Sequence, residues 1–245
     1  DDGTFPVERI YEYYKNTNKI PKTSGSSPED FIKVFDEIHK LYPDKHILHL
    51  AYSAVTTCSY QSAVIAAEDR DYITSIDTKQ VSVGQAAIVI ETARYLKDNP
   101  SATKEEAIAK VKELCQSSKM CFIPGELDYL RAGGRVSNAV FIGGKILRIH
   151  PSIEIENGYL VAKKKYRGKM DNVVISLIDE YLSINNLDKK ELYLLWSLGL
   201  SDSIRRSAEE KVKELGFENV RWLQTGCVIT THSGPGSFGI VGFLK

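Results

Sequence analysis

The first half of the chain alternates hydrophobic patterns of helical period with short apolar runs of strand length. Apolar residues recur at helical spacing from Phe31 to Leu41, and Ser27-Pro28 supplies the N-cap and first-turn residues that begin such a helix. Strands separated by helices indicate a parallel sheet with both faces covered. The other elements predicted here are helices at 60–70, 83–97 and 104–117 and strands at 46–53, 72–76 and 120–123.

The second half has a different pattern. Leu127 to Ala132 predicts a short helix that ends at Gly133-Gly134, and another helix is expected to begin near Ser137. Asn157-Gly158 lies between two alternating segments, favours a type I′ turn and so predicts a β-hairpin. A helix at 173–182, a strand at 192–198, a helix ending before residue 216 and two C-terminal strands follow.

These patterns predict an α/β protein with two lobes. We expect an N-terminal α/β lobe with a parallel sheet at residues 1–124 and a C-terminal α/β lobe with a mixed or antiparallel sheet at 125–245. The boundary is set approximately by the change of pattern near Pro124-Gly125.

Composition narrows the classes of partner. Lys and Arg number 32, as do Asp and Glu, so the chain lacks the surplus of positive charge that nucleic-acid binding needs. No apolar run reaches the roughly 18 residues of a membrane helix, so no stable membrane insertion is expected. The four cysteines are scattered and predict free thiols in a reducing compartment. With no signal-peptide pattern at the start, although the first residue is Asp1 and not Met, we expect a cytoplasmic protein.

Three loops rich in small polar residues adjoin predicted strands and suit an anionic ligand. Hydroxyl groups and backbone N–H groups at the end of a strand or the start of a helix bind anions, and in open α/β sheets such loops line the ligand crevice. Taken singly, each loop is also accounted for by ordinary turn and capping chemistry. The loops are 23–28 (TSGSSP), 56–61 (TTCSYQ) and 231–236 (THSGPG).

Five segments, in order, resemble the motifs of the DegV family. LDYLRAGGRVSNAVFIGGKILRIHPSIEIENGYL at 127–160 resembles the family's signature region. KTSGSSP at 22–28 is similar to its Thr-Ser-Gln-Pro-Ser-Pro loop, and YQSA at 60–63 to the end of its Ser-Gly-Thr-Tyr-Gln-Ser-Ala segment. SIDTKQVSVGQA resembles the third conserved block, and THSGPGSFGI the His-x-Gly-Pro-Gly terminus.

The resemblance implies a carrier and not an enzyme. Family members enclose one long-chain fatty acid between two lobes, without a metal or other cofactor, and present its carboxylate to a separate ATP-dependent fatty acid kinase that makes the acyl phosphate. Carried over to this sequence, Thr23 and Ser24 hold the carboxylate, Thr57 takes the family's serine position beside Cys58, and His232 completes the polar end. Arg167 matches a family arginine that bears on the kinase.

The sequence departs from the family pattern at several positions. Gly25-Ser26 stands in place of Gln-Pro, and Thr57-Cys58-Ser59 in place of Ser-Gly-Thr. Cys58 therefore adds a Cβ where the family has glycine. The opening strand of the family, with its Thr-Asp-Ser-Thr motif, has no counterpart in these 245 residues.

Other functions remain open from the residues alone. A lipid acyl hydrolase would use Thr57 or Ser59 as the nucleophile and His232 as the base, but the sequence has no Gly-x-Ser-x-Gly segment. A regulatory protein without lipid is the third reading. His46 and His49 suggest no metal site, because residues three apart on a strand point to opposite faces.

Overall fold

The computed structural model describes residues 4–134 and 149–245, and it has the mixed α/β architecture predicted from the sequence. The predicted helix near Ser137 lies outside these residues. In chain order the elements are α1 (Glu8–Thr17), α2 (Pro28–Leu41), β1 (Ile47–Ala51), α3 (Ser59–Ala66), β2 (Ile73–Asp77), α4 (Ser82–Asp98), α5 (Lys104–Ser117), β3 (Ser118–Ile123), α6 (Leu127–Gly133), β4 (Ile149–Glu156), β5 (Tyr159–Arg167), α7 (Met170–Ile184), β6 (Glu191–Trp196), α8 (Asp202–Glu214), β7 (Asn219–Gln224), α9 (Cys227–Ser233) and β8 (Phe238–Phe243).

The chain divides by its contacts into two compact units. Unit 1 contains the described residues of Asp1–Thr23, Ser118–Glu156 and Leu160–Lys245. Unit 2 contains Ser24–Ser117 and the short segment Asn157–Tyr159. The sequence-based division into 1–124 and 125–245 stays a prediction about domains, whereas the contacts change from one unit to the other between residues 23 and 24 and between 117 and 118.

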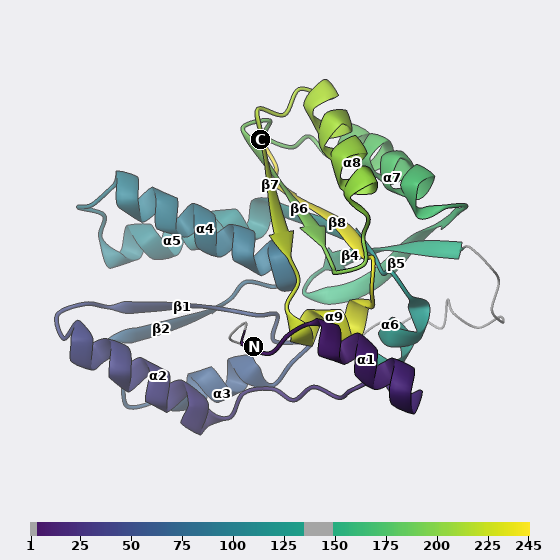
Figure 1. The fold of residues 1–245 in the computed structure, drawn as a ribbon. Helices are drawn as coiled ribbons and strands as arrows, with labels where there is room; N and C mark the ends of the chain where they lie inside the picture. The colour runs from purple at the N-terminus through teal and green to yellow at the C-terminus, as the bar shows by residue number, and fades with distance from the viewer. Residues whose placement is uncertain (1–3, 135–148) are drawn as a thin grey trace. The chain divides into compact units, whose positions relative to one another are not determined.

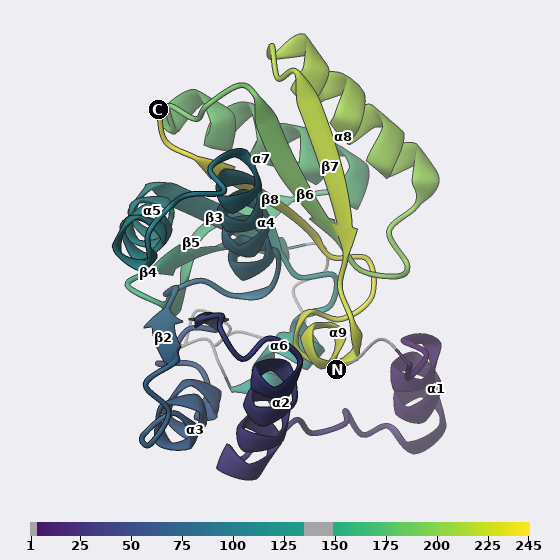
Figure 2. The ribbon, with the colours of Figure 1, turned by 90° about the vertical axis from the view of Figure 1, so that its left-hand side faces the viewer.

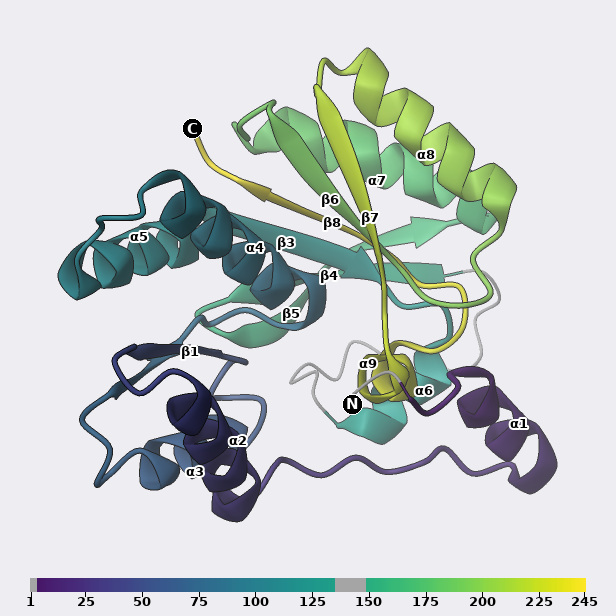
Figure 3. The ribbon, with the colours of Figure 1, turned by 60° about the vertical axis from the view of Figure 1, so that its left-hand side comes forward.

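Unit 2 is built around a two-stranded parallel sheet. Strands β1 and β2 pair in register from Ile47 opposite Ile73 to Ala51 opposite Asp77. Figures 1 and 3 show the sheet between the α2–α3 pair and the α4–α5 pair. Parallel strands need helical crossovers, and helices lie on both faces of the sheet, as the sequence pattern predicted, although most residues of β1 and β2 are only partly buried. Phe35, Ala63, Ala66 and Ile73 form the buried cluster on the α2–α3 side.

The helix start predicted at Ser27 is confirmed in unit 2. Ser27 Oγ accepts from the backbone N–H of Asp30 at 3.3 Å, and the Asp30 carboxylate accepts from the Ser27 N–H at 2.8 Å. Thr103 and Glu106 repeat this reciprocal arrangement at the start of α5. Each box satisfies backbone donors that a helix N-terminus otherwise leaves without partners.

Unit 1 contains a six-stranded mixed sheet in the order β5-β4-β3-β8-β6-β7. Strands β6 and β7 are parallel, whereas β3 is antiparallel to both β4 and β8. The position of β3 differs from the expectation that it would join the parallel strands of the first half. Its buried residues from Met120 to Ile123 pair along β8, from Val241 to Phe238, which only tertiary contacts select.

Helices cover the six-stranded sheet and gather at one of its ends. Figures 1 and 2 show α7 and α8 side by side over the sheet, where Val174, Ile178 and Val212 are fully buried in the main core. Helices α1, α6 and α9 lie together where β6 and β7 end. The burial of one apolar face on each helix is the main stabilising contribution of such packing.

The predicted hairpin is confirmed in its turn geometry. Asn157 and Gly158 have φ angles of 50° and 87°, the two positive values that a type I′ turn requires. The turn residues belong to unit 2, where Ser53 Oγ donates to the carbonyl of Gly158 at 2.9 Å. A Cβ at residue 158 would lie 2.5 Å from Ser53 Oγ, so close approach and backbone conformation both favour glycine there.

Candidate functional site

Thr23 and His232 meet in unit 1 although 209 positions separate them. Thr23 Oγ1 lies 2.8 Å from Nε2 of His232, and the hydrogen bond is partly buried. Thr23 lies in the extended segment between α1 and α2. His232 is in the last turn of α9, whereas the sequence predicts a loop at residues 231–236. The structure thus places together a hydroxyl and an imidazole that were both predicted to contact a carboxylate.

Gly133, at the end of α6, lies against the Nδ1 side of the His232 imidazole, whereas Thr23 lies at Nε2. A Cβ added at Gly133 would lie 2.2 Å from Nδ1 of His232, so the ring occupies the space that a side chain would need. Helices α6 and α9 pack against each other. The sequence predicts only a helix end at Gly133-Gly134, and Gly134, with a φ angle of 61°, does fill that role. The Gly-Gly pair is visible in the sequence as a helix end. The sequence does not show that its first residue, Gly133, leaves room for the His232 ring.

A small aromatic cluster anchors α1 beside these helices. Ile10, Tyr129 and Cys227 are buried together, and the rings of Tyr11 and Tyr14 contact Tyr129 edge to face. The Tyr11 hydroxyl donates to the carbonyl of Leu198 at 2.9 Å. Burial raises the pKa of Tyr11 to about 12, so this hydroxyl keeps its proton at neutral pH and remains a donor.

The first two predicted loops meet within unit 2. The backbone N–H of Ser26 donates to Ser59 Oγ at 3.1 Å, and Ser59 Oγ lies 3.0 Å from Oγ1 of Thr57. A Cβ added at Gly25 would lie 2.5 Å from Sγ of Cys58 and 3.2 Å from Thr57 Oγ1. The two departures from the family pattern, Gly25 and Cys58, are therefore in direct contact, and the thiol fills space left by the glycine.

Ser24 is the remaining predicted ligand residue. It is exposed, and it follows Thr23 in the chain at the point where the contacts change from unit 1 to unit 2. Across the described ranges, its hydroxyl has no hydrogen bond to another residue of the chain. Its donor and acceptor capacity is thus available to solvent or to a ligand.

Unit 2 also contains an apolar cavity of about 520 Å³. Of the predicted loops, Ser26 contributes to the lining, whereas Ser24, Thr57 and Cys58 do not. The volume lies within the range of about 300–1,000 Å³ that small-molecule sites occupy. The walls come from α2, β1 and α4 and include Phe31, Val34, Phe35, Ile38, His49, Leu50, Val89 and Leu96.

His46 and His49 bind side chains of β2 rather than each other. His46 Nε2 lies 2.8 Å from Thr74 Oγ1, and His49 Nδ1 lies 3.2 Å from Ser75 Oγ. Burial lowers the pKa of both histidines. Within residues 4–134 and 149–245, no group of three or more His, Cys, Asp or Glu side chains is arranged to hold a metal ion.

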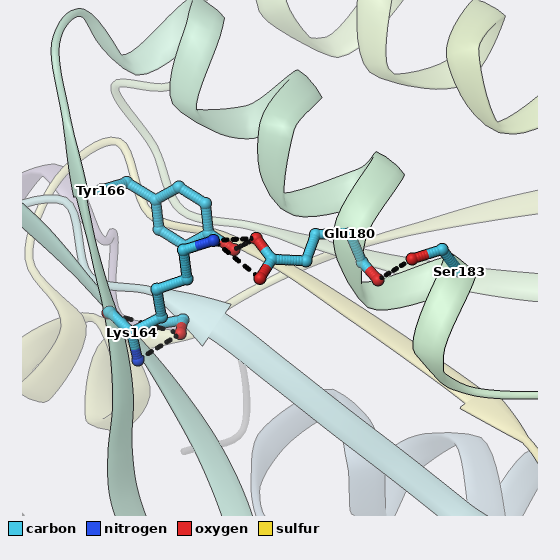
Figure 4. A network of polar contacts seen from close by, with 5 residues as sticks. Lys164, Tyr166, Glu180 and Ser183 are labelled. Carbon is cyan, nitrogen blue, oxygen red and sulfur yellow. Dashed lines mark hydrogen bonds and ion pairs between the residues drawn. The ribbon is translucent and has the colours of Figure 1, made fainter.

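The basic hairpin strand β5 has two differently used faces. Figure 4 shows Lys164 and Tyr166 directed at Glu180 on α7, with Lys164 Nζ 2.6 Å and the Tyr166 hydroxyl 2.8 Å from the same carboxylate oxygen. The hydrogen bond from Lys164 is the largest cause that lowers the pKa of Glu180. Lys165 and Arg167 alternate with these residues and are exposed, with no ion pair to another described residue.

The four cysteines are free, as predicted. Burial raises the pKa of Cys115 to about 11 and also raises the pKa of Cys121 well above its ordinary value, so both remain protonated at neutral pH. Cys58 is exposed. Among the helices that the structure describes, none combines the length and the apolar composition needed to cross a bilayer.

Comparison with known proteins shows which family this chain resembles. The model of the DegV family of uncharacterised proteins matches residues 1–245. A DegV domain-containing protein of Caldanaerobacter subterraneus subsp. tengcongensis is 31% identical over 241 residues, which cover 94% of this chain and 81% of that protein. A fatty acid-binding protein of Thermotoga maritima is also 31% identical over 241 residues, covering 95% of this chain and 81% of its own length.

Solved structures agree in fold. A Thermotoga maritima protein whose structure is described as revealing fatty acid binding function is 27% identical, with a TM-score of 0.81 over 97% of this chain and 83% of that one. A Thermus thermophilus DegV family protein, whose structure is described under fatty acid binding, is 24% identical, with a TM-score of 0.85 over 98% of this chain and 85% of that one, and shows the shared fold. The full-length family match and these relatives together confirm the resemblance seen in the sequence, and the chain belongs to the DegV family.

Proposed function

We propose that this protein is a carrier that binds one long-chain fatty acid and holds its carboxylate at the Thr23–His232 pair. The hydrogen bond between these two side chains carries the proposal, because it unites two polar groups from opposite ends of the sequence. The relatives described as fatty acid-binding support the same ligand class. Ser24, Thr57 and Cys58, which belong to unit 2, stay proposed ligand residues.

The chemistry of the pair suits a carboxylate. When Nε2 of His232 carries the proton, it donates to Thr23 Oγ1, and the threonine hydroxyl proton is then available to a carboxylate oxygen. A carboxylate removed from water must be hydrogen-bonded, since an unpaired buried charge costs several kcal/mol. The alkyl chain supplies affinity without direction, about 0.8 kcal/mol for each buried methylene. Polar groups fix which end of the ligand they hold, and apolar burial supplies the strength.

The proposed partner is a separate ATP-dependent fatty acid kinase that forms the acyl phosphate. The exposed cations Lys165 and Arg167 on β5 support a docking surface for it, because the neighbouring Lys164 is already paired with Glu180. Such exposed, unpaired charges act mainly on the rate and specificity of association. The location proposed for this exchange is the cytoplasm.

Identification of the ligand that co-purifies with the intact chain tests the carrier proposal. Native mass spectrometry of the protein, before and after incubation with oleic acid, is expected to show one fatty acid per chain, released unchanged on extraction. Failure to load any fatty acid would refute the carrier and favour a regulatory protein without lipid. Consumption of acyl esters, abolished by His232→Gln, would instead establish the hydrolase alternative.

A further inference from the structure

Two fully buried serines lie behind the helix that presents His232. Ser197 follows β6 and Ser237 precedes β8, and both have no exposed surface. Neither belongs to the residues proposed to touch a fatty acid. Buried hydroxyl groups in a protein interior carry a cost unless they are hydrogen-bonded, so their partners identify what they stabilise.

Both hydroxyl groups serve the C-terminal turn of α9. Ser197 Oγ donates to the carbonyl of Gly234 at 2.7 Å and accepts from the backbone N–H of Ser237 at 2.8 Å. Ser237 Oγ lies 2.9 Å from the carbonyl of Ser233 and 3.0 Å from that of Gly234, and it accepts from the N–H of Gly125 at 3.1 Å. The two carbonyls bound in this way belong to the residues that directly follow His232.

Helix α9 depends on such outside partners. It has only seven residues, and helices of that length are not stable by themselves in water. The last carbonyls of a helix have no partner within the helix, and here the hydroxyl groups of Ser197 and Ser237, together with the backbone N–H of Gly125 on the Ser233 carbonyl, provide the missing donors. The chain then leaves the helix at Gly234, with a φ angle of 72°, directly against the backbone of Glu126.

We infer that Ser197 and Ser237 are positioning residues for the fatty acid head-group site: they hold the last turn of α9 so that His232 Nε2 remains at Thr23 Oγ1. The inference rests on the proposed function, because the carboxylate is the ligand that this geometry would serve. The serines act through the backbone of residues 233 and 234 and do not contact the ligand. Their removal loosens the turn while both site side chains stay present.

The experiment compares Ser237→Ala and Ser197→Ala with the control Ser152→Ala in the full chain. Ser152 is a buried serine of unit 1 whose hydroxyl accepts from the Lys164 N–H, far along the chain from α9. Two quantities are measured: the affinity for oleic acid, and the ¹⁵N chemical shifts of the His232 ring in ligand-free protein, assigned with His232→Gln. The ring shifts report the tautomer and the hydrogen bond to Thr23 without any lipid.

We expect Ser197→Ala and Ser237→Ala each to weaken oleate binding about tenfold, because the lost backbone hydrogen bonds loosen the last turn of α9, and to change the ring shifts. Ser152→Ala should lower thermal stability without altering either quantity. If Ser197→Ala and Ser237→Ala both kept the wild-type His232 ring shifts and the wild-type oleate affinity, the inference would be overturned. If Ser237→Ala fails to fold, Ser197→Ala decides the question. A wild-type protein that binds no fatty acid would refute the carrier function, and the ring shifts of the ligand-free protein would still test the positioning role.

Discussion

The backbone of residue 25 lies against the thiol of Cys58, where a Cβ added at Gly25 would be 2.5 Å from Sγ. Gly25→Ala should therefore push the thiol or the loop aside and lower the thermal stability of the protein. Because the same loop includes Ser24 and contacts Ser59, oleate retention should fall as well. Differential scanning fluorimetry and lipid retention after gel filtration measure the two effects.

The double variant Gly25→Ala/Cys58→Ala is the control for this contact. Removing Sγ frees the space that the new methyl group needs, so the double variant should regain most of the stability lost in Gly25→Ala. Additive effects of the two substitutions would show that the residues do not interact. Cys58→Ala alone should change stability little, because Cys58 is exposed.

Thr23→Val should weaken oleate binding by roughly 1–3 kcal/mol while retaining the size of the side chain. The substitution removes the hydroxyl that bonds to His232 Nε2 and is proposed to donate to the carboxylate. Thr23→Ser keeps that hydroxyl and should bind nearly as well as the wild type. Isothermal titration calorimetry with oleate separates the two variants, and equal affinities for them would remove Thr23 from the head-group site.

Gly133→Ala should displace the imidazole of His232, since the added Cβ would lie 2.2 Å from Nδ1. Oleate affinity is expected to fall, by an amount comparable to the loss in Thr23→Val. Gly134→Ala is the matched control: among the described residues that do not adjoin it in the chain, no atom lies within 4 Å of its added Cβ, but its φ of 61° imposes a backbone strain of about 1 kcal/mol. If the two alanine variants lost affinity equally, the contact with His232 would not be the cause.

The free energy of unfolding should decrease as the pH falls below 6.5, in part through His49. Burial lowers the pKa of His49 in the folded protein, so the unfolded chain takes up the proton more readily. The contribution is therefore complete above the ordinary pKa of 6.5 and is lost as the pH falls toward the lowered value. The free energy of unfolding, measured by urea unfolding between pH 7.5 and 5, should depend less steeply on pH in His49→Gln than in the wild type.

Part of the pH dependence of the unfolding free energy should remain in His49→Gln. The pKa of His46 is also lowered, mainly by burial and further by the charge of Lys104, so this residue acts in the same direction. His46→Gln/His49→Gln should show the smallest dependence of the three proteins. If the double variant kept the pH dependence of the wild type, groups other than these two histidines would be responsible for it.

Arg167→Ala should leave oleate binding unchanged and lower the rate at which a cognate kinase phosphorylates the bound acid. Arg167 is exposed at the end of β5 and lies in no ion pair with a described residue, so its loss costs the fold little. Lys164→Ala is the comparison, because Lys164 is engaged by Glu180 and should affect stability more than phosphorylation. Equal phosphorylation of Arg167→Ala and wild type would exclude this arginine from the docking surface.

The sequence alone determined the features that depend on neighbouring residues. Two capping boxes, the αL residue at Gly134 and the type I′ turn at Asn157-Gly158 all follow from side-chain and backbone preferences within four positions. The alternation of apolar strands and helices likewise determined the α/β class, and the ordered motifs determined the family. These features depend on short segments or on the order of many segments along the chain, so they can be predicted from the sequence without the folded structure.

Which distant segments meet depends on tertiary contacts that the local sequence does not specify. Strand β3 joined β8, His232 proved to lie in a short helix, and Gly25 and Gly133 proved to face Cys58 and His232. An apolar strand can pair with any exposed edge, and a glycine in a sequence does not say which atom needs the space of its missing side chain. Those choices are made by the packing free energy of the whole chain, to which residues 209 positions apart contribute together.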